Sequence, residues 1–129
     1  MKIILLSGKT GSGKSITLDM LYKRIVKNNI IIIERTNLLT KNDFECVILY
    51  NNKTVAIYSM GDYLKFCTNA IIKYSNQDIL IMAYSEKFDA ELDKVIEGFD
   101  YHCVIRKTKS NEDDIDKIIS ELNKSTNGI

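Results

Sequence analysis

The residues with the clearest chemical capacity lie between Gly8 and Ser15 and follow the pattern G-x-x-x-x-G-K-[ST]. In order they are Gly8, Lys9, Thr10, Gly11, Ser12, Gly13, Lys14 and Ser15. Glycines let a backbone turn through dihedrals closed to other residues, so that successive N–H groups face one anion. Lys14 would bring a mobile charge to the outer phosphates, and the Ser15 hydroxyl is a candidate ligand for magnesium. The pattern predicts a site for a polyphosphate and Mg²⁺.

The sequence around this segment provides the strand and helix that such a loop needs. Lys2 to Ser7 is a short apolar run, and apolar residues recur at helical spacing from Ile16 to Ile25. We expect the helix to begin near Gly13 and to reach about Asn28, with its positive N-terminal end aimed at phosphate. An ordinary glycine-rich turn would leave the Lys-Ser pair unexplained, because a cation at a helix start opposes the dipole unless an anion is near.

With this motif and the alternation of strands and helices after it, the chain resembles the P-loop NTPase superfamily. The resemblance implies that Gly8 to Ser15 bind a nucleoside triphosphate together with Mg²⁺. Base selection is weakly encoded, so ATP is expected by default and GTP is the alternative. The motif specifies the ligand well and the biological process poorly.

The rest of the chain predicts a single P-loop domain, residues 1–129, with a three-layer α/β/α sandwich and a mostly parallel sheet. Ile30 to Ile33 is interpreted as a strand buried on both faces, and residues 37–44 as a loop. Two β-rich runs joined by Asn51-Asn52 predict a hairpin that adds one antiparallel edge strand. Further elements are predicted as a helix over 64–74, a strand over 79–84, a helix ending near Gly98, a strand over 101–106 and a closing helix capped by Ser110.

In such folds ligands bind outside the carboxyl ends of the strands, which separates candidate site residues from the others. Asp78 and Asp100 precede their strands and should lie at the far end. Residues that follow their strands are candidates: Glu34, Arg35, Ser59, Asp62, Ser85, Lys87, Lys107 and Thr108.

Asp62 is the most promising carboxylate among these candidates. Gly61 could bring a backbone N–H to a γ-phosphate, and Asp62 could reach the metal ion. The preceding hairpin resembles the strand pair before the Asp-x-x-Gly switch of GTPases, although Tyr58 stands where that family has its Asp. We therefore expect Ser15 and Asp62 at the metal and Lys14 and Asp62 in catalysis. An equally open interpretation is that Asp62 only caps the helix that follows.

Other side chains have weaker functional interpretations. Thr40-Lys41-Asn42-Asp43 matches a guanine-binding motif by letters but precedes the hairpin, so the match is taken as a coincidence. Arg35 would either clamp a phosphate or carboxylate or form a surface ion pair. Tyr63 and Tyr74 lie near one helical face and are expected to pack against neighbouring side chains rather than to stack on a ligand.

Composition limits the partners and the compartment. The net charge is +1, from 18 basic and 17 acidic residues, so nothing indicates nucleic acid. Three widely spaced cysteines among apolar residues predict buried free thiols and a cytoplasmic protein. The apolar runs are too short to span a membrane.

Three functions are compatible with these residues. The first is slow or partner-stimulated Mg-dependent hydrolysis of the triphosphate, with no clear general base. The second is a phosphotransferase similar to small nucleoside and nucleotide kinases, in which Arg35 and residues 36–44 receive the acceptor. The third is a non-hydrolysing module whose segment 60–62 is ordered by nucleotide for a protein partner.

Overall fold

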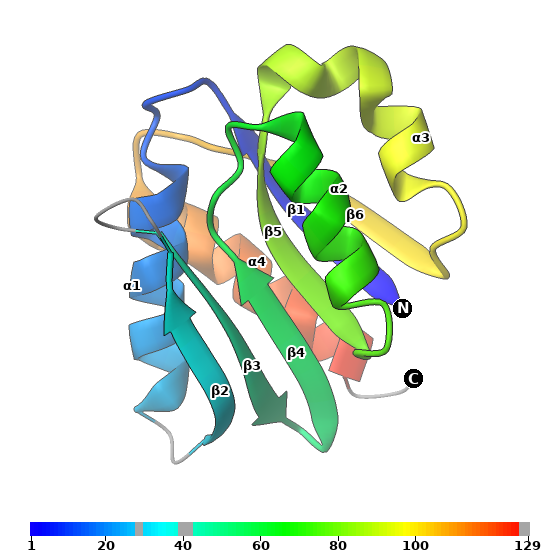
Figure 1. The fold of residues 1–129 in the computed structure, drawn as a ribbon. Coiled ribbons are helices and arrows are strands. Elements are labelled where there is room, and N and C mark those ends of the chain that lie inside the picture. Colours follow the sequence, from blue (N-terminus) through cyan, green and yellow to red (C-terminus); the bar gives the residue numbers. More distant parts are fainter. Residues whose placement is uncertain (28–29, 39–42, 127–129) are drawn as a thin grey trace.

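The computed structural model describes residues 1–27, 30–38 and 43–126, which form six strands in one sheet with helices on both faces (Figure 1). The strand order is β2-β3-β4-β5-β1-β6. In chain order the elements are β1 (Lys2–Gly8), α1 (Lys14–Val26), β2 (Ile31–Asn37), β3 (Phe44–Tyr50), β4 (Lys53–Tyr58), α2 (Leu64–Lys73), β5 (Ile79–Ser85), the 3₁₀ helix η1 (Glu86–Glu91), α3 (Leu92–Ile96), β6 (Tyr101–Arg106) and α4 (Asn111–Thr126).

Two apolar clusters, one on each face of the sheet, hold the layers together. In β1, Ile4 and Leu6 pack with residues of α1 and α4, whereas Ile3 and Leu5 pack with residues of α2 and α3. Because successive side chains of a strand point to opposite faces, a continuous apolar strand serves both clusters. The prediction of a layered α/β fold with a mostly parallel sheet is confirmed (Figure 1).

The predicted hairpin is present, but its antiparallel strand does not lie at the edge. Asn51 and Asn52 adopt positive φ values of 49° and 64° and connect β3 to β4. β3 is antiparallel to β4 and also pairs with β2, which is the edge strand. The antiparallel strand is therefore second from the edge.

The interpretation of residues 30–33 as a doubly buried parallel strand is wrong. All seven residues of β2 are exposed, and Ile31 and Ile33 are 61% and 55% exposed. Among the described strands β2 pairs only with β3, and its register shifts between Ile32 and Glu34. An apolar run indicates that its residues favour a β-strand. It does not indicate how many neighbouring strands that strand has in the sheet.

The direction of β3 determines which residues share an edge of the sheet. β1, β4, β5 and β6 are parallel, so their carboxyl ends lie together. Because β3 runs the opposite way, its first residue, Phe44, pairs near the end of β4, and the Ser59 N–H donates to the Phe44 carbonyl at 3.1 Å. Asp43, which immediately precedes Phe44, therefore also reaches the carboxyl edge.

Several smaller predictions are confirmed. The Ser110 hydroxyl accepts a hydrogen bond from the Asp113 N–H at 3.2 Å at the start of α4, and Gly98 has a positive φ of 85° after α3. Asp78 and Asp100 contact the first residues of the chain, away from the carboxyl edge. Cys46, Cys67 and Cys103 are free thiols; Cys46 and Cys67 are buried as predicted, whereas Cys103 is half-buried. No helix within the described ranges has the length and apolar character needed to cross a membrane.

Candidate functional site

The segment between β1 and α1 has the backbone geometry for which its glycines are needed. Gly11 and Gly13 adopt φ values of 79° and 91°, where an L side chain would be strained. Gly13 is the N-cap of α1 and contributes no side chain to capping. The Ser12 N–H donates to the Lys9 carbonyl at 3.1 Å, which closes a turn within the segment. The sequence therefore forms a tight connection that leads directly into a helix N-terminus.

The Lys14 side chain folds back beneath this connection and is almost completely buried. Its ammonium group donates to the carbonyls of Gly8 at 3.2 Å and Lys9 at 2.8 Å. It also forms an ion pair with Asp62 at 3.3 Å. A cation at the start of α1 opposes the helix dipole, so this carboxylate offsets an otherwise unfavourable position.

Asp62 is tied to Lys14 and does not cap α2. The N-cap of α2 is Tyr63, whose carbonyl accepts from the Phe66 and Cys67 N–H groups. The interpretation of Asp62 as a helix cap is therefore wrong. Its Oδ1 atom is buried and, among the described residues, has no hydrogen-bond donor apart from its ion pair, while 40% of the side chain is exposed.

Ser15 lies beside a different carboxylate, that of Asp43. Its hydroxyl is 2.6 Å from Asp43 Oδ1 and 3.1 Å from the Ser59 carbonyl oxygen. The Ser59 hydroxyl donates to Asp43 Oδ1 at 3.0 Å and accepts from the Phe44 N–H at 2.9 Å. Two hydroxyls, a carboxylate and a carbonyl thus converge, and such hard oxygen donors suit Mg²⁺.

Asp43 is not among the predicted site residues, because only residues that follow strands were expected at this edge and Asp43 precedes one. The signal was in the predicted hairpin, because an antiparallel strand begins where its parallel neighbours end. The matching motif letters at Thr40, Lys41 and Asn42 lie outside the described residues. Within those residues, no group of three or more His, Cys, Asp or Glu side chains is arranged to hold a metal. A Mg²⁺ ion bound by one or two protein groups needs no such cluster, because it keeps several waters and takes phosphate oxygens.

Gly61 allows the connection after β4 to pass directly against β5. A Cβ atom at this position would lie 2.4 Å from the carbonyl carbon of Ala83. The Gly61 carbonyl accepts a hydrogen bond from the Ser85 N–H at 2.9 Å, which fastens the two segments. This close approach explains the glycine, and the predicted contact of its N–H with a γ-phosphate stays a prediction.

Gly61→Ala is expected to destabilise the protein by about 3 kcal/mol, because backbone atoms of β5 cannot yield to the new methyl group. Gly98→Ala is the matched control, since a Cβ there meets no atom within 4 Å and carries only the strain of positive φ, about 1 kcal/mol. Urea unfolding of both variants measures the difference. Equal losses would contradict the role assigned to Gly61.

A buried ion pair supports the glycine-rich connection from its other side. Lys107 donates to Asp114 at 2.9 Å, and both side chains are almost completely buried. The Lys107 N–H donates to the Ser7 carbonyl at 2.6 Å, and its Cβ lies 2.9 Å from where a Gly8 Cβ would be. Burial by itself raises the pKa of the Asp114 carboxyl, but hydrogen bonds from Lys107 and Thr108 outweigh it and hold that pKa below its ordinary value.

The remaining candidates have structural partners or lie apart. The Arg35 guanidinium lies 4.4 Å and 4.3 Å from the ring centroids of Tyr22 and Phe44 and 3.6 Å from Asp19, which agrees with the ion-pair interpretation. Glu34 is exposed on the edge strand. The Ser85 hydroxyl accepts from the Lys87 N–H at 3.4 Å and caps η1.

The two tyrosines expected to pack have different environments. Tyr74 is buried as predicted, with 2% exposure. Tyr63 is 58% exposed and packs edge-to-face against the Phe66 ring, so it lies on the surface.

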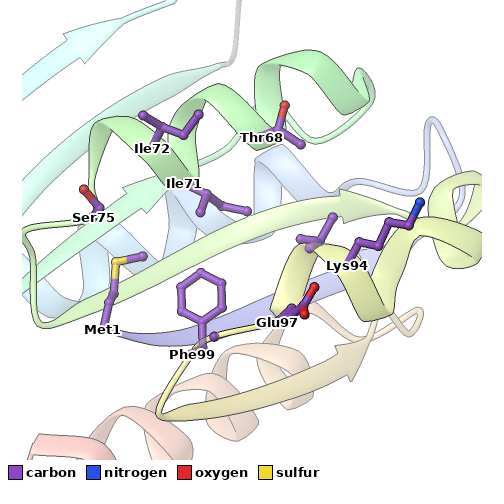
Figure 2. Close-up of a pocket in the computed structure, with 10 residues that line it drawn as sticks. Met1, Thr68, Ile71, Ile72, Ser75, Lys94, Glu97 and Phe99 are labelled. Atoms are coloured by element: carbon purple, nitrogen blue, oxygen red, sulfur yellow. The ribbon is translucent and has the colours of Figure 1, made fainter.

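A pocket of the structure lies away from the glycine-rich connection. Figure 2 shows it between α2, α3 and the N-terminus, with Met1, Ile71 and Phe99 in its wall. Its volume is about 420 Å³, and none of the residues from Gly8 to Ser15 lines it. It is therefore a separate feature from the cluster around Lys14 and Ser15.

Comparison with known proteins gave no matching family model, no matching curated protein and no matching solved structure. What the fold and the side chains define is an α/β protein with a mostly parallel sheet and a polar cluster at the carboxyl edge of that sheet.

Proposed function

We propose that this protein binds a nucleoside triphosphate with Mg²⁺ and cleaves its γ-phosphate slowly or when a partner stimulates it. The fold around the proposed site is of the kind that binds ligands at the carboxyl edge of a parallel sheet. ATP is the expected nucleotide and GTP is the alternative.

The observation that carries this proposal is the convergence of Lys14, Ser15, Asp43 and Asp62 on one helix start. Each carboxylate has its own partner there: Asp62 lies 3.3 Å from the Lys14 ammonium, and Asp43 lies 2.6 Å from the Ser15 hydroxyl. A plain glycine-rich turn needs neither arrangement. A cation and an oxygen cluster at adjacent residues suit the two parts of a metal-bound triphosphate.

Each group of the site has its own role in the proposed binding and cleavage of the triphosphate. Unpaired N–H groups at the start of α1 and in the glycine-rich segment bind phosphate oxygens. Lys14 exchanges its contact with Asp62 for the outer phosphates and stabilises negative charge that develops there. Asp62, freed from that contact, orients the attacking water. Ser15 and Asp43 would hold Mg²⁺, which supplies neutralisation of the phosphate charge when it is bound.

Thermal unfolding with each of the four ribonucleoside triphosphates and Mg²⁺ tests the proposal directly. A triphosphate at a hundred times its Kd is expected to stabilise the native state by about 2.7 kcal/mol, and the shift should identify the base. Slow release of phosphate from the same nucleotide is expected in a turnover assay. If none of the four changes the transition, the proposed function is wrong.

Asp43→Asn is expected to raise the Mg²⁺ concentration needed for triphosphate binding by about tenfold or more, because it removes the charge beside Ser15. Asp62→Asn is the informative comparison, since it removes a carboxylate of the same site that contacts Lys14 instead. Its Mg²⁺ dependence should stay near that of the wild type. If Asp62→Asn raised the Mg²⁺ requirement and Asp43→Asn did not, the metal would be bound by Ser15 and Asp62, and the assignment of Asp43 would be wrong. Magnesium titrations monitored by calorimetry distinguish the two.

A further inference from the structure

Two exposed aromatic residues, Tyr63 and Phe66, follow Asp62 in the chain. Tyr63 and Phe66 are 58% and 40% exposed, and their ring centroids are 5.5 Å apart in an edge-to-face arrangement. Tyr63 is the N-cap of α2 and Phe66 lies in the first turn of that helix, at the carboxyl edge of the sheet. Large aromatic side chains usually contribute to a core, so their placement on the surface next to a charged site requires a reason.

A lysine from another element completes this surface. The Lys87 ammonium lies 5.9 Å from the Tyr63 ring centroid and 5.1 Å from that of Phe88. Lys87 belongs to η1, which follows β5, so the surface is built from two segments that meet beyond the strand ends. The Lys87 ammonium contacts these two rings, and no ion pair with a carboxylate is found for it within the described ranges.

The distance to the proposed phosphate site is short. Tyr63 is the neighbour of Asp62 in the chain, and Asp62 contacts Lys14 at 3.3 Å. A molecule bound at Tyr63 would therefore lie close to Asp62, and the Lys87 ammonium would be beside it. Aromatic rings bind planar ring systems by stacking, and an ammonium group binds anions.

We propose that Tyr63, Phe66 and Lys87 bind a second substrate, a planar ring compound with an anionic group and a hydroxyl, to which the γ-phosphoryl group is transferred. This inference rests on the proposed triphosphate site. In the transfer, the acceptor oxygen forms a bond to the γ-phosphorus while the bond from that phosphorus to the β,γ-bridging oxygen breaks. Asp62 takes the hydroxyl proton, and the nucleoside diphosphate leaves. Nucleoside 5′-monophosphates have the required ring, anion and hydroxyl chemistry.

Binding of the ribo- and deoxyribonucleoside 5′-monophosphates, measured by calorimetry with Mg²⁺ and a non-hydrolysable triphosphate analogue present, tests the surface. We expect one monophosphate to bind and Tyr63→Ala to weaken that binding about tenfold, with Tyr63→Phe retaining it. Lys87→Gln should weaken binding of the monophosphate but not of the matching nucleoside, because only the former has the anion. Ile72→Ala, at an exposed apolar residue near the other end of α2, is the control and should change neither.

The second readout is the fate of the γ-phosphate. Label from the γ-position is expected in the monophosphate, and the yield of labelled product should fall in Tyr63→Ala. If the triphosphate analogue binds but no monophosphate does, or if label appears only as inorganic phosphate, the acceptor surface is wrong while the triphosphate site stands. If no triphosphate binds, both proposals are overturned. Loss of monophosphate binding in Ile72→Ala as well would reject the assignment to these three residues.

Discussion

Lys14→Ala is expected to weaken binding of the Mg-bound triphosphate by about 3 kcal/mol, roughly a hundredfold in Kd. The Lys14 ammonium is the buried cation of the glycine-rich segment, held between two carbonyls and Asp62. A triphosphate would take the place of the Asp62 carboxylate as its anionic partner. Alanine removes that charge-assisted contact without changing the backbone that offers the N–H groups.

Removal of Lys14 also leaves Asp62 Oδ1 buried without its cation, so some stability should be lost, about 1–3 kcal/mol. The double variant Lys14→Ala with Asp62→Asn relieves that penalty and separates instability from loss of binding. Lys9→Ala is the matched control, because this lysine of the same segment is exposed. Calorimetry with the triphosphate should find binding near wild type in Lys9→Ala and strong weakening in both variants that lack Lys14. Affinity unchanged by Lys14→Ala would remove the site assignment.

Local requirements were predictable from the sequence, because each depends on residues that are neighbours in the chain. Gly11 and Gly13 have the positive φ values that the motif predicts, and Ser110 caps its helix through its own side chain. The apolar strands β1 and β5 were recognised because burial on both faces removes the polar alternation. Such features can be predicted without knowing which residues lie across the sheet.

Features that depend on residues distant in the chain were mispredicted. The apolar residues of β2 predicted a buried strand, but the strand lies at the edge of the sheet and all seven of its residues are exposed. Asp43 was passed over because its place at the carboxyl edge requires knowing that β3 is antiparallel and second in the sheet. The position of Asp62 before a helix left a cap and a metal ligand equally open, yet its partner is Lys14, far away in the sequence. Long-range pairing therefore decides which carboxylates meet the glycine-rich segment.

The buried pair of Lys107 and Asp114 connects the stability of the fold to this segment. The Lys107 side chain packs against Gly8 and its backbone N–H donates to Ser7, so its position helps to fix the end of β1. Its charge is compensated by Asp114, which also accepts from the N–H and hydroxyl of Thr108. Loss of the carboxylate charge would leave a buried ammonium without its counterion.

Asp114→Asn is expected to destabilise the protein by about 3 kcal/mol near neutral pH, because breaking one side of a buried pair is costly. Asp116→Asn, on the same helix, is the control: its carboxylate pairs with Arg24 at 2.9 Å on the exposed surface and should cost less than about 1 kcal/mol. Urea unfolding of the three proteins measures both effects. A loss in Asp114→Asn no larger than in Asp116→Asn would show that the buried pair contributes little.

The same variant should have a characteristic pH dependence. Hydrogen bonds from Lys107 and Thr108 outweigh burial and hold the folded-state pKa of Asp114 below its ordinary value of 3.8. A carboxyl with a lowered pKa contributes stability above its unfolded pKa and loses that contribution as the pH falls through the folded one. The stability difference between wild type and Asp114→Asn should thus be constant above about pH 5 and shrink below about pH 4. If this stability difference grew as the pH fell, the folded protein would favour the protonated carboxyl of Asp114. The carboxylate charge would then not be what stabilises the buried Lys107 ammonium.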